Sequence, residues 1–80
     1  MVDFLEEVKK QISEQFAIEA EDIEDESFLE ADLNITELDL EDLCAYFEDK
    51  YQIAIPQSVY PKFKKVTDLA DYLYENIDQA

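Results

Sequence analysis

Hydrophobic residues recur every three or four positions in three stretches of the chain, a spacing typical of amphipathic helices. The first stretch predicts a helix over residues 4–17. Its apolar stripe consists of Leu5, Val8, Ile12 and Phe16. Asp3 is expected to cap this helix, because an Asp followed three residues later by Glu6 resembles a capping box.

The second stretch predicts a helix over residues 36–51. Its apolar stripe consists of Leu40, Leu43, Cys44, Phe47 and Tyr51, and acidic residues occupy the other faces. Two pairs are candidates for the cap, either Thr36 with Asp39 or Asn34 with Glu37. Since Cys44 lies on the apolar stripe, we interpret it as a small buried hydrophobic residue and not as a nucleophile.

The third stretch predicts a helix over residues 66–77. Its apolar stripe consists of Val66, Leu69, Ala70, Leu73 and Ile77. Before it, residues 57–60 are expected to form one helical turn that Pro61 interrupts. Lys62, Lys64 and Lys65 then form the only basic cluster.

The periodicity is absent from residues 18–36, which predicts a long loop. Its acidic run, residues 19–26, favours a hydrated loop over a metal site. Its apolar residues, expected to pin the loop to the core, are Ile23, Phe28, Leu29 and Leu33. The predicted fold is an all-α bundle of three main helices and one short helix with a long first loop, and residues 1–80 form a single domain.

The charge of the chain is strongly negative. Twenty-two acidic residues face six lysines, with no Arg or His, for a formal net charge of −16. This balance argues against binding to nucleic acid or anionic membranes and favours basic protein surfaces as partners. Without Gly there is no glycine-rich phosphate loop, and without His there is no His-based triad or usual zinc cluster. We expect no catalytic residues, no metal, no membrane segment, a monomer, and a cytoplasmic location.

These elements, in this order and spacing, resemble the acyl and peptidyl carrier protein family. The similar segments are Val8-Lys9-Lys10, Phe28-Leu29-Glu30, Asp32-Leu33, Leu38-Asp39, Ile55-Pro56 and Val66-Thr67-Asp68. The central motif of the family reads roughly Asp-Leu-Gly-x-Asp-Ser-Leu, and residues 32–38 read Asp-Leu-Asn-Ile-Thr-Glu-Leu. The resemblance therefore places Glu37 where the family has the serine that carries phosphopantetheine.

This replacement changes the chemistry that the resemblance implies. In the family, the serine hydroxyl attacks a phosphate of coenzyme A, and the thiol of the resulting arm bears the acyl group. A carboxylate at Glu37 would give a hydrolysable mixed anhydride, so no 4'-phosphopantetheine is expected there. Thr36 is the one adjacent hydroxyl and the alternative attachment site. Glu37 is either natural or an engineered block, and the further departures at Asn34 and Thr36 favour the natural case.

The resemblance favours a non-enzymatic role in fatty-acid or polyketide-type biosynthesis through an acidic docking face for basic enzymes. The expected docking residues beside Glu37 are Leu38, Asp39, Asp42, Glu48 and Asp49. A carrier modified at Thr36 is one alternative, although Tyr46, Phe47 and Phe63 would then compete with cargo for apolar space. An acidic decoy that mimics nucleic acid is another alternative, from a different functional class.

Overall fold

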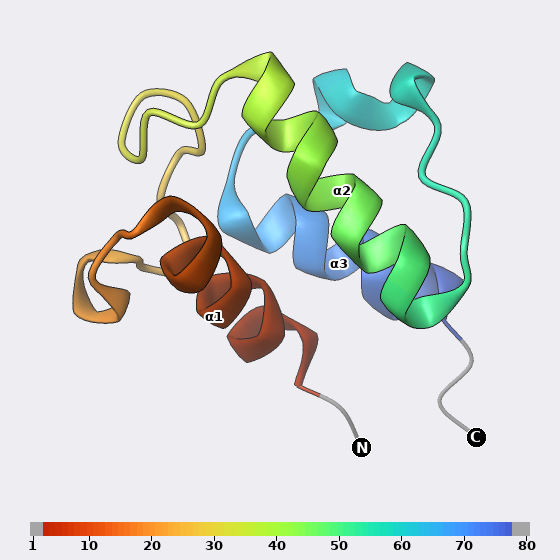
Figure 1. Cartoon of the computed structure of the whole chain (residues 1–80), viewed down its shortest axis with the longest axis horizontal. Helices are drawn as coiled ribbons and strands as arrows, with labels where there is room; N and C mark the ends of the chain where they lie inside the picture. Colours follow the sequence, from red (N-terminus) through yellow and green to blue (C-terminus); the bar gives the residue numbers. More distant parts are fainter. Residues whose placement is uncertain (1–2, 78–80) are drawn as a thin grey trace.

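The computed structural model describes residues 3–77, and its main elements are three α-helices. They are α1 (Phe4–Phe16), α2 (Glu37–Tyr51) and α3 (Val66–Asn76). Two 3-10 helices, η1 (Ala20–Asp22) and η2 (Gln57–Lys62), lie in the connections. Figure 1 shows α2 crossing above α3, α1 at the lower left, and η2 at the upper right beside α2. The all-α prediction is confirmed, and each main helix begins and ends within one residue of its predicted bounds.

Helix α1 begins as the sequence predicts. The side chain of Asp3 accepts a hydrogen bond from the backbone N–H of Glu6 at 3.2 Å. The helix ends at Phe16, because the following residue, Ala17, has a φ of 56° that stops the helical path. Val8 and Ile12 are fully buried, and Phe4, outside the predicted stripe, is buried with them. Phe4, the first residue of α1, therefore belongs to the buried face of the helix.

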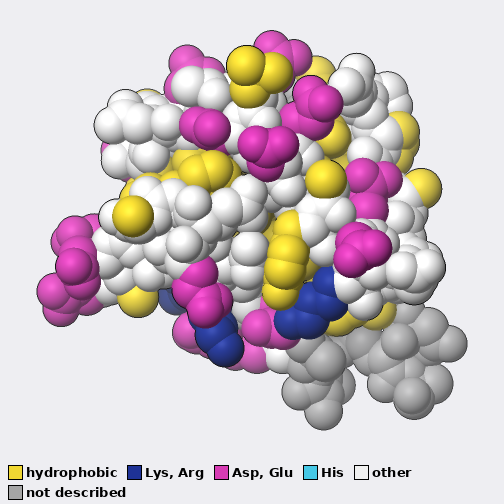
Figure 2. Space-filling model, in the orientation of Figure 1, with side chains coloured by type: hydrophobic (Ala, Val, Ile, Leu, Met, Phe, Trp, Pro, Cys, Tyr) yellow, Lys and Arg dark blue, Asp and Glu magenta, His cyan; other side chains and the backbone are white. Residues whose placement is uncertain are grey.

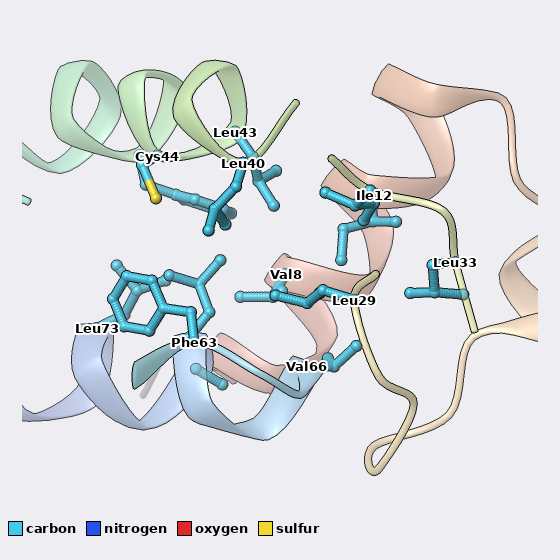
Figure 3. Packing of buried hydrophobic residues seen from close by; sticks show 14 of the residues in the cluster. Val8, Ile12, Leu29, Leu33, Leu40, Leu43, Cys44, Phe63, Val66 and Leu73 are labelled. Atoms are coloured by element: carbon cyan, nitrogen blue, oxygen red, sulfur yellow. The ribbon is translucent and has the colours of Figure 1, made fainter. Parts of the chain in front are cut away.

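The three helices bury one continuous apolar core. Its α2 members are Leu40, Leu43, Cys44 and Phe47, and its α3 members are Val66, Leu69, Ala70 and Leu73. In Figure 3, Leu40 and Cys44 point from α2 towards Phe63 and Leu73, while Val8 and Ile12 approach from α1. The predicted stripes of α2 and α3 are thus the packed faces, with Tyr51 and Ile77 half-buried at their ends.

The long first loop is pinned to the core by part of the predicted set. Ile23, Leu29 and Leu33 are buried, as expected. The expectation for Phe28 is wrong, because its side chain is 44% exposed and its ring lies 5.4 Å from the ammonium of Lys65. The loop also contains η1, a short helix that the sequence pattern did not predict.

Two ion pairs fasten the acidic run of this loop. Lys9 of α1 contacts Asp25 at 2.6 Å, and Lys65 at the start of α3 contacts Glu26 at 3.1 Å. The next residue, Ser27, is buried, and its carbonyl accepts the Val66 N–H at 3.0 Å, which joins the loop to α3. The acidic run is therefore largely exposed and is held at its C-terminal end.

Helix η2 corrects the prediction that Pro61 interrupts the short helix. The 3-10 conformation continues through Pro61 to Lys62. The Phe63 N–H donates to the Tyr60 carbonyl at 2.9 Å, so Pro61 is the second residue of that turn, where no N–H is required. Among the helices of residues 3–77, none has the length and apolar character to cross a membrane.

Candidate functional site

The start of α2 is the point where the predicted site residues meet. Thr36 is the N-cap, and its hydroxyl oxygen accepts the Asp39 N–H at 3.2 Å. The Asp39 carboxylate in turn accepts the Thr36 N–H at 3.1 Å, which completes a capping box. Of the two predicted caps, the Thr36–Asp39 pair is therefore the one that forms.

A hydrogen-bonded turn before the cap fixes the direction in which α2 leaves the loop. Its pivot is Asn34, which has a φ of 57°. Asn tolerates this left-handed conformation better than most residues, which suits a position where the family motif has Gly. The Asn34 N–H donates to the Glu30 carbonyl at 3.0 Å, and the Ile35 N–H donates to the Leu29 carbonyl at 2.8 Å. Burial of Ile35, which the sequence analysis missed, anchors the turn under α2.

Glu37 and Leu38 are the first two residues of α2, and both are exposed. Leu38 is 74% exposed, the most open large hydrophobic side chain in residues 3–77. The carboxylates of Glu37 and Asp39 lie in the first turn, where they complement the positive end of the helix dipole. An acid and an open apolar side chain thus stand together at the exposed tip of the helix.

The remaining acidic residues of α2 differ in how far they are exposed to solvent. Asp42 and Asp49 follow Leu38 by four and eleven positions, so they lie on the same side of the helix. Both are exposed. Glu48 faces inward instead, since its carboxylate accepts the Ile55 N–H at 2.9 Å. Glu41 is exposed on this face, although the sequence analysis did not include it among the docking residues. In Figure 2, acidic side chains follow the course of α2.

A groove of about 500 Å³ opens beside Glu37, between the turn before α2 and helix η2. Its buried apolar lining consists of Leu29, Ile35, Leu40 and Phe63. Phe47 and Phe63 are buried in the core, as expected for residues that take up apolar space, and the groove remains open despite them. The same expectation is wrong for Tyr46, which is 37% exposed on the outside of α2.

The interior behind this groove holds Cys44, which is completely buried. Burial raises the pKa of its thiol to about 12, against an ordinary value of 9.0, and hydrogen bonding with Tyr60 opposes only part of this rise. The thiol therefore stays protonated near neutral pH, where a thiolate nucleophile is not formed. This agrees with the interpretation of Cys44 as a core residue.

The opposite end of α2 is tied to α1. Lys50 contacts the carboxylate of Glu7 at 2.9 Å, and the Tyr51 hydroxyl donates to the same oxygen at 3.0 Å. The Lys50 hydrogen bond holds the pKa of Glu7 below its ordinary value of 4.5, and the same contact raises the pKa of Lys50. The ring of Tyr51 also packs edge-on against Phe4, with centroids 5.6 Å apart. No cluster of three or more potential metal ligands occurs in residues 3–77.

Comparison with known proteins identifies the family. The chain is 35% identical over 75 residues to a protein of Helicobacter hepaticus named acyl carrier protein, covering 94% of this chain and 99% of that protein. A Campylobacter jejuni protein of the same name is 34% identical over 68 residues, covering 85% of this chain and 88% of that protein. No protein-family model matches the chain.

These names describe carriers and not enzymes, which agrees with the expectation that this chain is not an enzyme. The helical architecture agrees with the family assignment as well. On identity and coverage together, the chain belongs to the acyl carrier protein family.

Proposed function

We propose that this chain is an acyl-carrier-like protein of fatty-acid or polyketide-type biosynthesis that docks on partner enzymes without carrying phosphopantetheine. The observation that carries the proposal is the exposed carboxylate of Glu37 at the first residue of α2, in front of an acidic helix face. Glu37 stands in place of the attachment serine in this account. The acidic face, defined as Glu37, Leu38, Glu41, Asp42 and Asp49, contacts basic surfaces of biosynthetic enzymes.

Charge supports this mode of docking. A chain with a net charge of −16 attracts basic surfaces over a long range and repels anionic ones. Exposed rim charges mainly set the association rate and its dependence on salt, while an apolar contact adds affinity. Asp42 and Asp49 supply the charges, and Leu38 supplies an apolar contact among them. Asp39 and Glu48 contribute charge from positions already hydrogen-bonded within the fold.

The capping geometry supports an unmodified site. The one hydroxyl beside Glu37 belongs to Thr36, and its oxygen already accepts the Asp39 N–H. Attaching a phosphodiester to that oxygen would place a bulky group on the atom that caps α2, at the expense of the helix start. Thr36 is therefore a poorer attachment site than an exposed serine in the first turn would be.

Competition for a carrier-modifying enzyme tests the proposed docking. Increasing amounts of this chain are added while a phosphopantetheinyl transferase modifies an ordinary acyl carrier protein with coenzyme A. Docking without modification predicts that the chain slows this reaction and that added salt relieves the inhibition. The variant with Asp42→Lys and Asp49→Lys should inhibit less, whereas a control with Glu14→Lys and Asp71→Lys, at exposed positions on other helices, should inhibit nearly as well as wild type.

Two results would contradict the proposal. One is inhibition that salt does not change, and the other is equal inhibition by the two double variants. Both double variants change the net charge by four units, from −16 to −12, so total charge does not explain a difference between them.

A further inference from the structure

The groove beside Glu37 combines an apolar interior with charged side chains at its margin. Leu29 and Ile35 are each 3% exposed and Phe63 is 6% exposed, so the lining belongs to the core. Its volume of about 500 Å³ lies within the range of small-ligand pockets, so it is large enough to admit a Leu or Phe side chain. An apolar side chain entering the groove would therefore contact buried apolar residues.

The charges around the groove select the kind of molecule that enters it. Glu30 and Glu37 line it, and Lys64 is the one basic residue among its lining. Tyr60, also in the lining, has its pKa raised to about 12 by burial, and the nearby negative charges of Glu48 and Glu41 contribute to the rise. This local excess of acids, within a chain of net charge −16, opposes anionic groups and attracts cationic ones.

The position of the groove relates it to the acidic face. Glu37 belongs to both, because it lines the groove and begins α2. Two of the exposed large hydrophobic residues flank this junction, since Phe28 lines the groove and Leu38 follows Glu37 directly. A protein segment lying along the N-terminal end of α2 therefore reaches the margin of the groove at Glu37.

From this continuity and charge, we infer that the groove receives an apolar side chain from a basic segment of the docked partner, whose cationic residues lie beside Glu37 and Glu30. The inference rests on the proposed docking function and adds the anchor that selects among basic partners. Charge attracts many basic surfaces, whereas the groove favours those that also present a Leu-sized or Phe-sized side chain.

Two short peptides of equal charge distinguish the contribution of the apolar side chains from that of the basic residues. The basic anchored peptide is acetyl-Lys-Arg-Leu-Phe-Arg-Lys-amide, and its partner replaces Leu-Phe with Ala-Ala. Each is titrated into the ¹⁵N-labelled full chain, and backbone amide shifts are followed by NMR. Both peptides should shift amides of Asp42 and Asp49, but the anchored one alone should shift those of Ile35, Leu40 and Phe63. Burial of the anchor should make its binding about tenfold tighter.

A substitution that fills the groove tests whether the groove binds the apolar side chains of the peptide. Ala31 is exposed and lines the groove, so Ala31→Trp should occupy the groove and remove the tenfold preference for the anchored peptide. Ala20→Trp, at an exposed position in η1 outside the groove lining, should keep that preference. Thermal unfolding of both variants checks that they fold, and the two-peptide comparison on the wild-type chain needs neither variant.

The outcomes distinguish this inference from the proposed function. Equal affinity for both peptides, with no shifts at Ile35, Leu40 and Phe63, would overturn the groove inference and leave docking intact. Binding of neither peptide would count against docking itself. Octylammonium is titrated in parallel, and groove shifts with it but not with the anchored peptide would overturn the inference, because the groove would then accept a small amphiphile and not a partner segment.

Discussion

The two ends of α2 are held in place by different kinds of contact. At the C-terminal end, Tyr51 and Lys50 bind Glu7 of α1, and Phe47 is completely buried. At the N-terminal end, the capping box of Thr36 and Asp39 is local to the helix. Since this cap uses polar groups within four residues of each other, it leaves the outward side chains open to other molecules.

This difference explains how one helix can be both a structural element and a docking element. Contacts with α1 fix the C-terminal half, while the turn around Asn34 and the cap fix the direction of the N-terminal half. Leu38 stays 74% exposed because neither the contacts with α1 nor the turn and the cap cover its side chain. Loss of the anchored end should therefore damage the fold more than loss of the cap.

The largest expected effect is that of Phe47→Ala at the anchored end. Removing a completely buried Phe side chain leaves a cavity and should lower the free energy of unfolding by about 3–5 kcal/mol. The loss is a large share of the stability of an ordinary domain, about 5–15 kcal/mol. Urea unfolding followed by circular dichroism measures it.

Tyr46→Ala is the neighbouring control, because Tyr46 is 37% exposed and packs edge-on against Phe47 at 5.1 Å. Its loss should cost about 0.5–1.5 kcal/mol. Equal destabilisation by the two substitutions would show that the buried face of α2 does not dominate its stability.

A smaller effect is expected at the other end of α2. Thr36→Ala removes the oxygen that accepts the Asp39 N–H and should cost about 1 kcal/mol of unfolding free energy. Thr36→Ser keeps a capping oxygen and should retain most of that stability. If Ala and Ser were equally stable at this position, the start of α2 would be held by something other than its cap.

The smallest effect concerns the ion pair of Glu7 and Lys50, which is partly exposed and worth at most about 1 kcal/mol. The folded-state pKa of Glu7 is lowered from 4.5, so its contribution is present above pH 4.5 and is lost as pH falls through the lowered value. The pKa of Lys50 is raised from 10.5, so its contribution is present below pH 10.5 and is lost as pH rises through the raised value.

Glu7→Gln should therefore flatten the acid side of the stability–pH curve, measured by urea unfolding at several pH values below 6. Glu14→Gln, on the same helix but exposed, is the control and should leave that slope nearly unchanged. A wild-type slope in Glu7→Gln would mean that this pair does not couple the end of α2 to α1.

Local pattern predicted the helices because each one buries a single face, and a face shows in the sequence as a spacing of three or four residues. The family resemblance, and not this spacing, singled out Leu38, which is exposed, and Asn34, which has a φ of 57°. Local pattern was wrong for Phe28, because burial of a loop side chain depends on which segment packs beside it and not on its own apolar character.

The groove and the true orientation of Glu48 lay beyond such reasoning. The groove forms where the turn before α2 meets η2, and these segments are more than twenty residues apart in sequence. Glu48 turns inward because the chain after α2 brings the Ile55 N–H against its carboxylate. Only the folded path shows either feature, and both decide which acids and which apolar surface a partner meets.

The central claim is that Glu37 leaves this chain without a phosphopantetheine arm. Its most direct test is the intact mass of the chain after incubation with coenzyme A and a broad-specificity phosphopantetheinyl transferase, with an ordinary acyl carrier protein in the same tube. We expect no gain in mass for the wild-type chain and a gain of one phosphopantetheine for Glu37→Ser. A gain by the wild-type chain, placed by fragmentation on Thr36 or any other residue, would contradict this claim.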